Sequence, residues 1–123
     1  MSNSRSQDRN VAPRITIRID LRNGQIGPGK VRLLELVEQT GSIRQAAAAM
    51  KMSYRRAWLL LQSLEACFGV PIVEATTGGK QGGGARLSKL GQGVVTAYRT
   101  AERGANRTGL KALKSLPRAR NRK

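Results

Sequence analysis

Two serines, each standing before a short helical pattern, constrain the fold of this chain more than any other feature. Ser42 opens the run Ser-Ile-Arg-Gln and is followed by four alanines, and Ser53 precedes a longer stretch with apolar residues at helical spacing. A serine in this position accepts a hydrogen bond from a free N–H group of the first helical turn, and Gln45 completes the pattern of a capping box. Residues 42–68 are therefore expected to form two short helices joined at Lys51-Met52, as in a helix-turn-helix, although an ordinary helical hairpin fits the same pattern.

The second of these helices divides into an apolar side and a polar start. Its apolar residues recur at core spacing: Ala57, Leu60, Leu61, Leu64 and Phe68. Its first turn is polar and basic: Ser53, Tyr54, Arg55 and Arg56. In a helix-turn-helix this turn faces base edges in the major groove, and arginine can donate two parallel hydrogen bonds to guanine. Both arginines are candidates for base contacts, with phosphate contacts as the alternative for either one.

The residues before the helix pair predict a disordered arm, a strand and a helix. Residues 1–14 have no apolar period. Residues 15–22 alternate apolar and polar side chains, which predicts a half-buried strand. Gly27-Pro28-Gly29 marks a turn, and the apolar face that follows predicts a helix from Lys30 to about Gln39, ended by Thr40-Gly41.

The residues after the helix pair predict a β-hairpin with a glycine-rich tip. Residues 70–74 and 85–87 form two short strand patterns on either side of a segment rich in glycine. This segment has neither the Gly-Lys-Ser/Thr end nor the spacing of a nucleotide-binding loop. A hairpin wing, whose glycines let the backbone approach a phosphate, is the better interpretation, and a loop without a role is the alternative.

A final helix is expected from Ser88 to about residue 103. Gly104 and Gly109 weaken its continuation, so residues 104–123, rich in basic side chains, are interpreted as a flexible tail. One face of this final helix carries an apolar stripe. Together with the first helix, this stripe offers more apolar surface than a small domain needs to bury, which predicts a two-fold dimer. The stripe consists of Leu90, Val94, Tyr98 and Ala101.

Charge points to a polyanionic partner and composition argues against catalysis. The chain has 23 Lys and Arg against 7 Asp and Glu, a formal charge of +16 on 123 residues. There is no histidine and one cysteine, Cys67, so we expect no catalytic residues, no metal site and no cofactor. No apolar run is long enough for a membrane span or a signal peptide, and a cytoplasmic location without a membrane partner is expected.

The sequence resembles the N-terminal DNA-binding domain of ModE-type molybdate-dependent regulators and, more broadly, the LysR-type helix-turn-helix. The resemblance extends from Ile15 to about Glu102 and rests on GSIRQAAAAMKMSYRRAWLLLQSLE and EATTGGKQGGGARLSKLGQ. It implies a sequence-specific transcriptional regulator that binds double-stranded DNA as a homodimer on a palindromic operator, linked to molybdenum metabolism. The family's C-terminal oxyanion-binding modules have no counterpart in this sequence, so we expect DNA binding by this chain to be insensitive to molybdate.

The predicted fold is mainly α with a small β-hairpin wing, a winged helix-turn-helix over residues 15–103. The predicted DNA contacts are Ser42, Arg44, Gln45, Lys51, Ser53, Tyr54, Arg55, Arg56, Thr76, Thr77, Lys80 and Arg86. The residues assigned to packing are Met50, Met52, Trp58 and Cys67, and those assigned to surface ion pairs are Glu35, Glu38 and Glu65. A nucleoid-coating or RNA-binding protein without sequence preference would share the charge and is the main alternative; an enzyme is the third.

Overall fold

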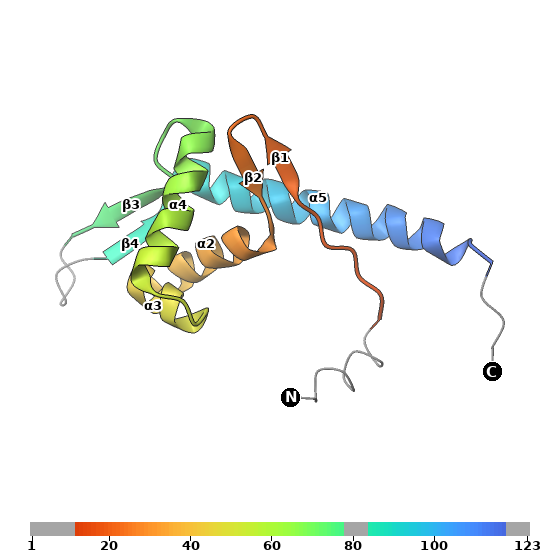
Figure 1. Cartoon of the computed structure of the whole chain (residues 1–123), viewed down its shortest axis with the longest axis horizontal. Coiled ribbons are helices and arrows are strands. Elements are labelled where there is room, and N and C mark those ends of the chain that lie inside the picture. Colours follow the sequence, from red (N-terminus) through yellow and green to blue (C-terminus); the bar gives the residue numbers. More distant parts are fainter. Residues whose placement is uncertain (1–11, 78–83, 118–123) are drawn as a thin grey trace.

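The structure, a computed structural model, describes residues 12–77 and 84–117 and shows the predicted winged helix-turn-helix. In chain order its elements are β1 (Ile19–Leu21), β2 (Gly24–Ile26), α2 (Pro28–Thr40), α3 (Ile43–Ala49), α4 (Tyr54–Phe68), β3 (Val73–Thr76), β4 (Gly84–Leu87) and α5 (Lys89–Lys114). The strands form two antiparallel hairpins, β1–β2 and β3–β4. α5 lies along the long axis of the molecule, α4 stands across it, and β3–β4 projects from one end (Figure 1).

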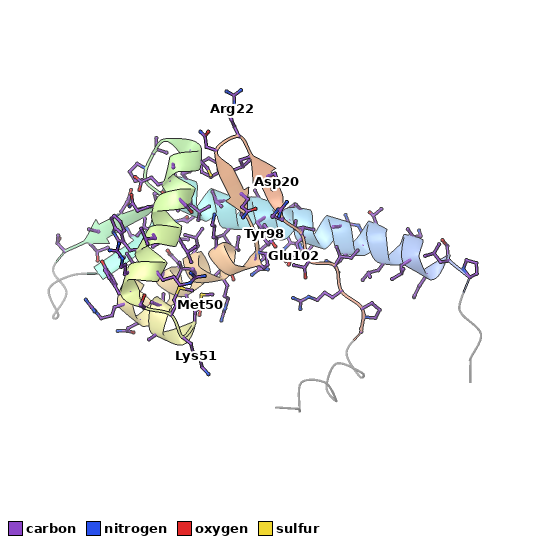
Figure 2. All side chains as sticks on the ribbon, in the orientation of Figure 1. Asp20, Arg22, Met50, Lys51, Tyr98 and Glu102 are labelled. Carbon is purple, nitrogen blue, oxygen red and sulfur yellow. The ribbon has the colours of Figure 1, made fainter. Side chains whose placement is uncertain are left out.

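The core lies where α2, α4 and α5 meet and is closed by the strands. Its largest fully buried side chains are Tyr98, Leu33, Leu34, Leu64, Ile72, Val31 and Val37. The ring of Tyr98 is buried while its hydroxyl donates a hydrogen bond of 2.8 Å to the carbonyl of Ile17. This one side chain therefore joins α5 to the N-terminal segment, and Figure 2 shows it beside the β1 region.

The N-terminal strand is shorter than predicted and belongs to a hairpin that was not predicted. Only Ile19–Leu21 forms strand pairs, with Gly24–Ile26. The expected alternation is present, because residues 15, 17, 19 and 21 are half-buried and residues 16, 18, 20 and 22 are exposed. Residues before Ile19 are bound by α5 instead of by a strand: the side chain of Asn106 accepts from the amide of Ile15 and donates to its carbonyl.

The wing strands are shifted relative to the sequence prediction. β3 begins at Val73, later than the predicted start at Val70, because Pro71 has no N–H group and the carbonyl of Ile72 accepts from Ser88 at 2.8 Å. β4 begins at Gly84, one residue earlier than predicted. Two bonds fix the base of the wing to α2: Glu38 accepts from the amide of Leu87, and Gly41 accepts from the amide of Ala85.

Helix α5 continues past the predicted boundary at residue 103 and ends at Lys114. Glycine within a helix costs about 1 kcal/mol relative to alanine, which is why Gly104 and Gly109 suggested an end. Tertiary contacts offset this cost: Asn106 binds Ile15, and Gly109 packs directly against the Ile15 side chain. The second half of α5 therefore extends away from the rest of the fold as a regular helix (Figure 1).

The apolar stripe predicted for dimerisation is largely part of the core of one chain. Val94 and Tyr98 are buried, and Leu90 packs partly buried against the same cluster. Only Ala101 is exposed. The prediction that Val94 and Tyr98 form a subunit interface is wrong, because the helix stripe already meets α2 and the strands within the same chain.

Two glycines near the start of α5 give a matched test of this packing. A Cβ at Gly91 would collide with the carbonyl oxygen of Ile72, whereas a Cβ at Gly93 would meet nothing within 4 Å. Gly91→Ala should lower the free energy of unfolding by about 1–3 kcal/mol, the usual cost of overpacking. Gly93→Ala should raise it by about 0.5–1 kcal/mol, since alanine favours the helix. Urea unfolding of both variants checks this; a harmless Gly91→Ala would contradict the packing.

A partly buried ion-pair network fixes α5 against α2. Arg99 donates two bonds of 2.9 Å to the carboxylate of Glu35 and one of 2.8 Å to Glu102. The Arg99 hydrogen bonds hold the pKa of Glu35 below its ordinary value of 4.5, against the opposing effect of burial. Glu35 was predicted to form a surface ion pair, and the structure places that pair between two helices.

Because its pKa is lower in the folded state, ionised Glu35 contributes stability that is fully present above pH 4.5 and lost as the pH falls through the folded pKa. Glu35→Gln should therefore lower the free energy of unfolding by about 1–2 kcal/mol at neutral pH. At acid pH, the free energies of unfolding of Glu35→Gln and the wild type should become equal. Asp20→Asn, which breaks the exposed pair with Arg18, is the control and should change stability by less than about 0.5 kcal/mol. A pH-independent effect of Glu35→Gln would contradict this account.

Candidate nucleic-acid interface

The two predicted serine caps are present and set the direction of α3 and α4. The Ser42 hydroxyl accepts from the amide of Gln45, and the Ser53 hydroxyl accepts from the amide of Arg56, both at 3.0 Å. The capping box is only half formed, because the amide of Ser42 donates to the Thr40 hydroxyl instead of to Gln45. The Gln45 side chain is thus left exposed on the surface of α3.

Small side chains let α3 and α4 approach closely, and a sharp turn joins them. Ala46, Ala47 and Ala57 are fully or almost fully buried. In the turn, Lys51 has φ of 57°, the left-handed conformation that costs a residue with a side chain about 1–2 kcal/mol. Its side chain is exposed and points away from the body beside the start of α4 (Figure 2).

The two arginines of the first turn of α4 point in different directions. Ala57, Leu61 and Leu64 mark the buried face of the helix. With about 100° between successive residues, Arg55 lies nearly opposite this face. Arg56 lies to one side and lines a groove of about 560 Å³ that also contains Arg18 and Lys30. The structure therefore separates two residues that the sequence treated alike.

The start of α3 and the start of α4 meet through a cation–π contact. The guanidinium of Arg44 lies 5.0 Å from the centre of the Tyr54 ring, and both side chains are exposed. Ser42, Gln45 and Ser53 lie within the same two helix starts. Together with Lys51 and Arg55, these five residues make seven predicted contact residues on the helix-turn-helix surface.

The wing carries the remaining predicted contacts on a separate element. Thr76 is half-buried at the end of β3, Thr77 follows it and is exposed, and Arg86 is exposed on β4. Arg86 lies 3.5 Å from Glu74 on the paired strand, an exposed ion pair of little energetic weight. Lys80 and the glycine-rich tip at 78–83 lie outside the described residues.

The packing and ion-pair assignments hold only in part. Trp58 was predicted to pack against the domain, but 42% of its surface is exposed. Met50 and Met52 pack against the core only partly buried. Cys67 is half-buried, and its thiol donates to the carbonyl of Ser63. Glu38 accepts from the amide of Leu87, and no cation of residues 12–77 and 84–117 forms an ion pair with it.

Glu65 likewise differs from the prediction, since its carboxylate accepts from the side chain of Gln62 at 3.5 Å. Among residues 12–77 and 84–117, no three His, Cys, Asp or Glu side chains gather in a group that could hold a metal ion. No helix in this part of the chain is both long and apolar enough to cross a membrane.

Sequence reasoning missed the apolar part of the exposed face of α4. Leu59 is 47% exposed and adjoins Trp58. The signal was present in the spacing, because residues 55, 59 and 62 lie opposite the buried positions 57, 61 and 64. Leu59 was overlooked because it stands in a run of three leucines, two of which pack against the core.

This arrangement of a capped helix pair and a β-hairpin matches a known family. The profile of the bacterial regulatory helix-turn-helix proteins of the lysR family matches residues 29–92, from the start of α2 to the start of α5. The chain belongs to the LysR family. The matched region contains every described residue of the candidate interface except Arg18, which lies in the N-terminal segment.

Among similar proteins of this kind are several ModE regulators. The transcriptional regulator ModE of Haemophilus influenzae is 41% identical over 63% of this chain and 31% of its own length. The molybdenum transport protein ModE of Azotobacter vinelandii is 38% identical over 59% of this chain and 27% of its own length. The DNA-binding transcriptional dual regulator ModE of Escherichia coli K12 is 37% identical over 58% and 27%. The chain thus spans about a third or less of these relatives.

The fold is also that of a solved DNA-binding domain. The CbnR DNA-binding domain, crystallised as a DNA complex, superposes with a TM-score of 0.54 at 22% identity, covering 71% of this chain and 94% of that one. Full-length CbnR with its target DNA gives a TM-score of 0.52 at 23% identity, over 68% of this chain and 27% of that one. At this identity the likeness supports the winged-helix fold.

Proposed function

We propose that this chain is a sequence-specific regulator of transcription that binds double-stranded DNA in the bacterial cytoplasm and does no chemistry on it. The observation that carries the proposal is the start of α4, where a serine-capped helix of a LysR-family domain presents exposed arginines and no acidic residue. A helix of this kind fits the major groove, with its first turn at the base edges. The positive charge of the chain supplies attraction to the phosphates.

Different residues would anchor and read the duplex. We propose that Arg55, opposite the buried face of α4, contacts bases, and that the other exposed cations contact phosphates: Arg44, Lys51, Arg56 and Arg86. The strained backbone of Lys51 supports such a role, because a glycine there would cost nothing in conformation but would carry no charge.

The relatives suggest which genes are controlled. Proteins named for molybdenum transport and for molybdenum-pterin binding share 38–39% identity with this chain. We propose that the regulated genes serve molybdenum metabolism.

Mapping of bound chromosomal sites in cells tests the proposal against a nucleoid-coating or RNA-binding role. A regulator gives discrete sites that share one palindromic sequence, some of them beside molybdenum genes. Even coverage of the chromosome, or recovery of RNA in place of DNA, would show that the alternative is correct.

Substitutions on either side of the interface should separate reading from anchoring. Arg55→Ala should weaken operator binding by about 1–3 kcal/mol and relax preference at particular base pairs. Lys51→Ala should weaken all duplexes alike. Arg22→Ala is the matched control, because Arg22 is exposed in the turn of the β1–β2 hairpin, on the opposite side of the molecule from Lys51 (Figure 2). Gel-shift titration on a panel of operator variants checks this; identical profiles for Arg55→Ala and Lys51→Ala would contradict the division.

A homodimer on a palindromic operator completes the proposal, with a different interface from the one predicted. Leu113 lies in the last turn of α5 and Leu116 just after its end, and they are 51% and 57% exposed. With Leu110, Ala12 and Pro13 they line an apolar groove of about 520 Å³. Because this part of α5 extends beyond the core, pairing with a second copy would bury these leucines (Figure 1).

A further inference from the structure

The middle of α4 exposes an apolar patch that the charged contacts do not explain. Leu59 and Trp58 are 47% and 42% exposed, next to each other on the helix. Leu59 lies one turn beyond Arg55, on the face opposite the buried Leu61 and Leu64. Large apolar side chains exposed side by side next to the basic start of α4 indicate a contact that requires them.

The cations around the patch indicate which kind of partner it contacts. Arg55 lies at its start, and Arg44 stacks on Tyr54 beside it. Arg56 and Lys51 add two more exposed cations at the same end of the helix. An apolar surface on another protein would leave these charges without counter-charges. The major groove instead has phosphates along both edges, and its floor has an apolar feature wherever thymine presents its 5-methyl group.

We propose that Leu59, flanked by Trp58, reads thymine methyl groups within each half of the operator. The inference rests on the proposed function and adds a specificity-determining contact to it. Leu59 lies about 6 Å along the helix from Arg55, at a rise of 1.5 Å per residue. Bases on one strand are about 3.4 Å apart, so the thymine lies within about two base pairs of the base that Arg55 contacts. Trp58 shields this contact from water.

Deoxyuridine tests the contact because it lacks only the 5-methyl group and keeps every hydrogen-bonding atom of thymine. Operator thymines are replaced one at a time, and the dissociation constant of the full chain is measured for each duplex. One thymine in each half-site should weaken binding about fourfold when replaced, the effect of exposing one buried methyl group. Leu59→Ala should bind the thymine and uracil duplexes equally.

Two comparisons make the outcome decisive. Arg55→Ala should bind more weakly overall and still prefer thymine at the same position. Leu59→Met keeps an apolar side chain and should retain part of the preference. If the wild type selects its operator yet no replacement changes its affinity by more than twofold, the inference is wrong and the proposed function stands. If no duplex is preferred, the proposed function itself fails. If Leu59→Ala abolishes dimerisation in sedimentation and keeps the thymine preference, the patch is a subunit interface and the inference is also wrong.

Discussion

Raising the salt concentration from about 50 to about 200 mM should weaken operator binding by about 10⁴-fold. In the proposed dimer, each protomer has four exposed cations for which we propose phosphate contacts: Arg44, Lys51, Arg56 and Arg86. A dimer would then neutralise about eight phosphates, so the logarithm of the association constant should fall against the logarithm of salt with a slope near −7. Titrations by fluorescence anisotropy at several salt concentrations measure this slope.

Single substitutions show which cations produce the salt dependence. Lys51→Ala and Arg56→Ala each remove two phosphate contacts from the dimer, and each should make the slope less negative by about 2. Arg22→Ala, on the opposite side of the molecule from Lys51, should leave the slope unchanged. A slope that responds equally to all three substitutions would mean that the net charge, and not the helix-turn-helix surface, binds the DNA.

Replacing Leu113 by aspartate should weaken binding to a palindromic operator by about 100-fold or more. The exposed leucines at the end of α5 are the proposed contact between protomers, and a carboxylate placed there would have to be desolvated on association. Each monomer would then bind one half-site without the advantage of a second, linked site. Affinity for an isolated half-site should change little.

Sedimentation of the same variants checks the assembly. The wild type should be a dimer at about 10 μM and Leu113→Asp a monomer. Val70→Asp is the control, because Val70 is 47% exposed but follows the C-terminal end of α4, far along the chain from Leu113. A monomeric wild type with and without operator, or a dimeric Leu113→Asp, would show that the interface is wrongly placed.

Half-sites in the operator should lie about one helical turn, or a multiple of it, apart.

The parts of the fold that sequence predicted well are those with local signals. Ser42, Ser53 and Ser88 each cap a helix, and Gly41 ends α2 in the left-handed conformation. These signals depend on a few neighbouring residues, so the order and direction of the helices could be read from the chain. The winged helix-turn-helix followed from them and is confirmed.

The errors arose where contacts between distant residues decided the outcome. Asn106 and Gly109 bind Ile15, about ninety residues earlier, and this contact lets α5 continue past two glycines. Likewise, an apolar stripe does not reveal whether it packs within one chain or between two, and Val94 and Tyr98 pack within one. The β1–β2 hairpin was missed because strands of three residues leave too short a pattern.

For the candidate site, sequence identified the capped turn and its basic residues but not how they point. Helical spacing from the core positions of α4 could have placed Arg55 outward, but only the fold shows that Arg56 lines a groove with Arg18 and Lys30. Their contacts with DNA, and those of the other residues proposed from the sequence, stay predictions.

Selectivity for one duplex over another tests the central claim most directly. The dissociation constant of the full chain is measured at about 150 mM salt for the palindrome shared by its chromosomal sites and for a scrambled duplex of equal length and composition. A sequence-specific regulator of this family should bind the palindrome at least about 10³-fold more tightly, and Arg55→Ala should reduce that ratio about tenfold. Equal affinity for the two duplexes would contradict the account.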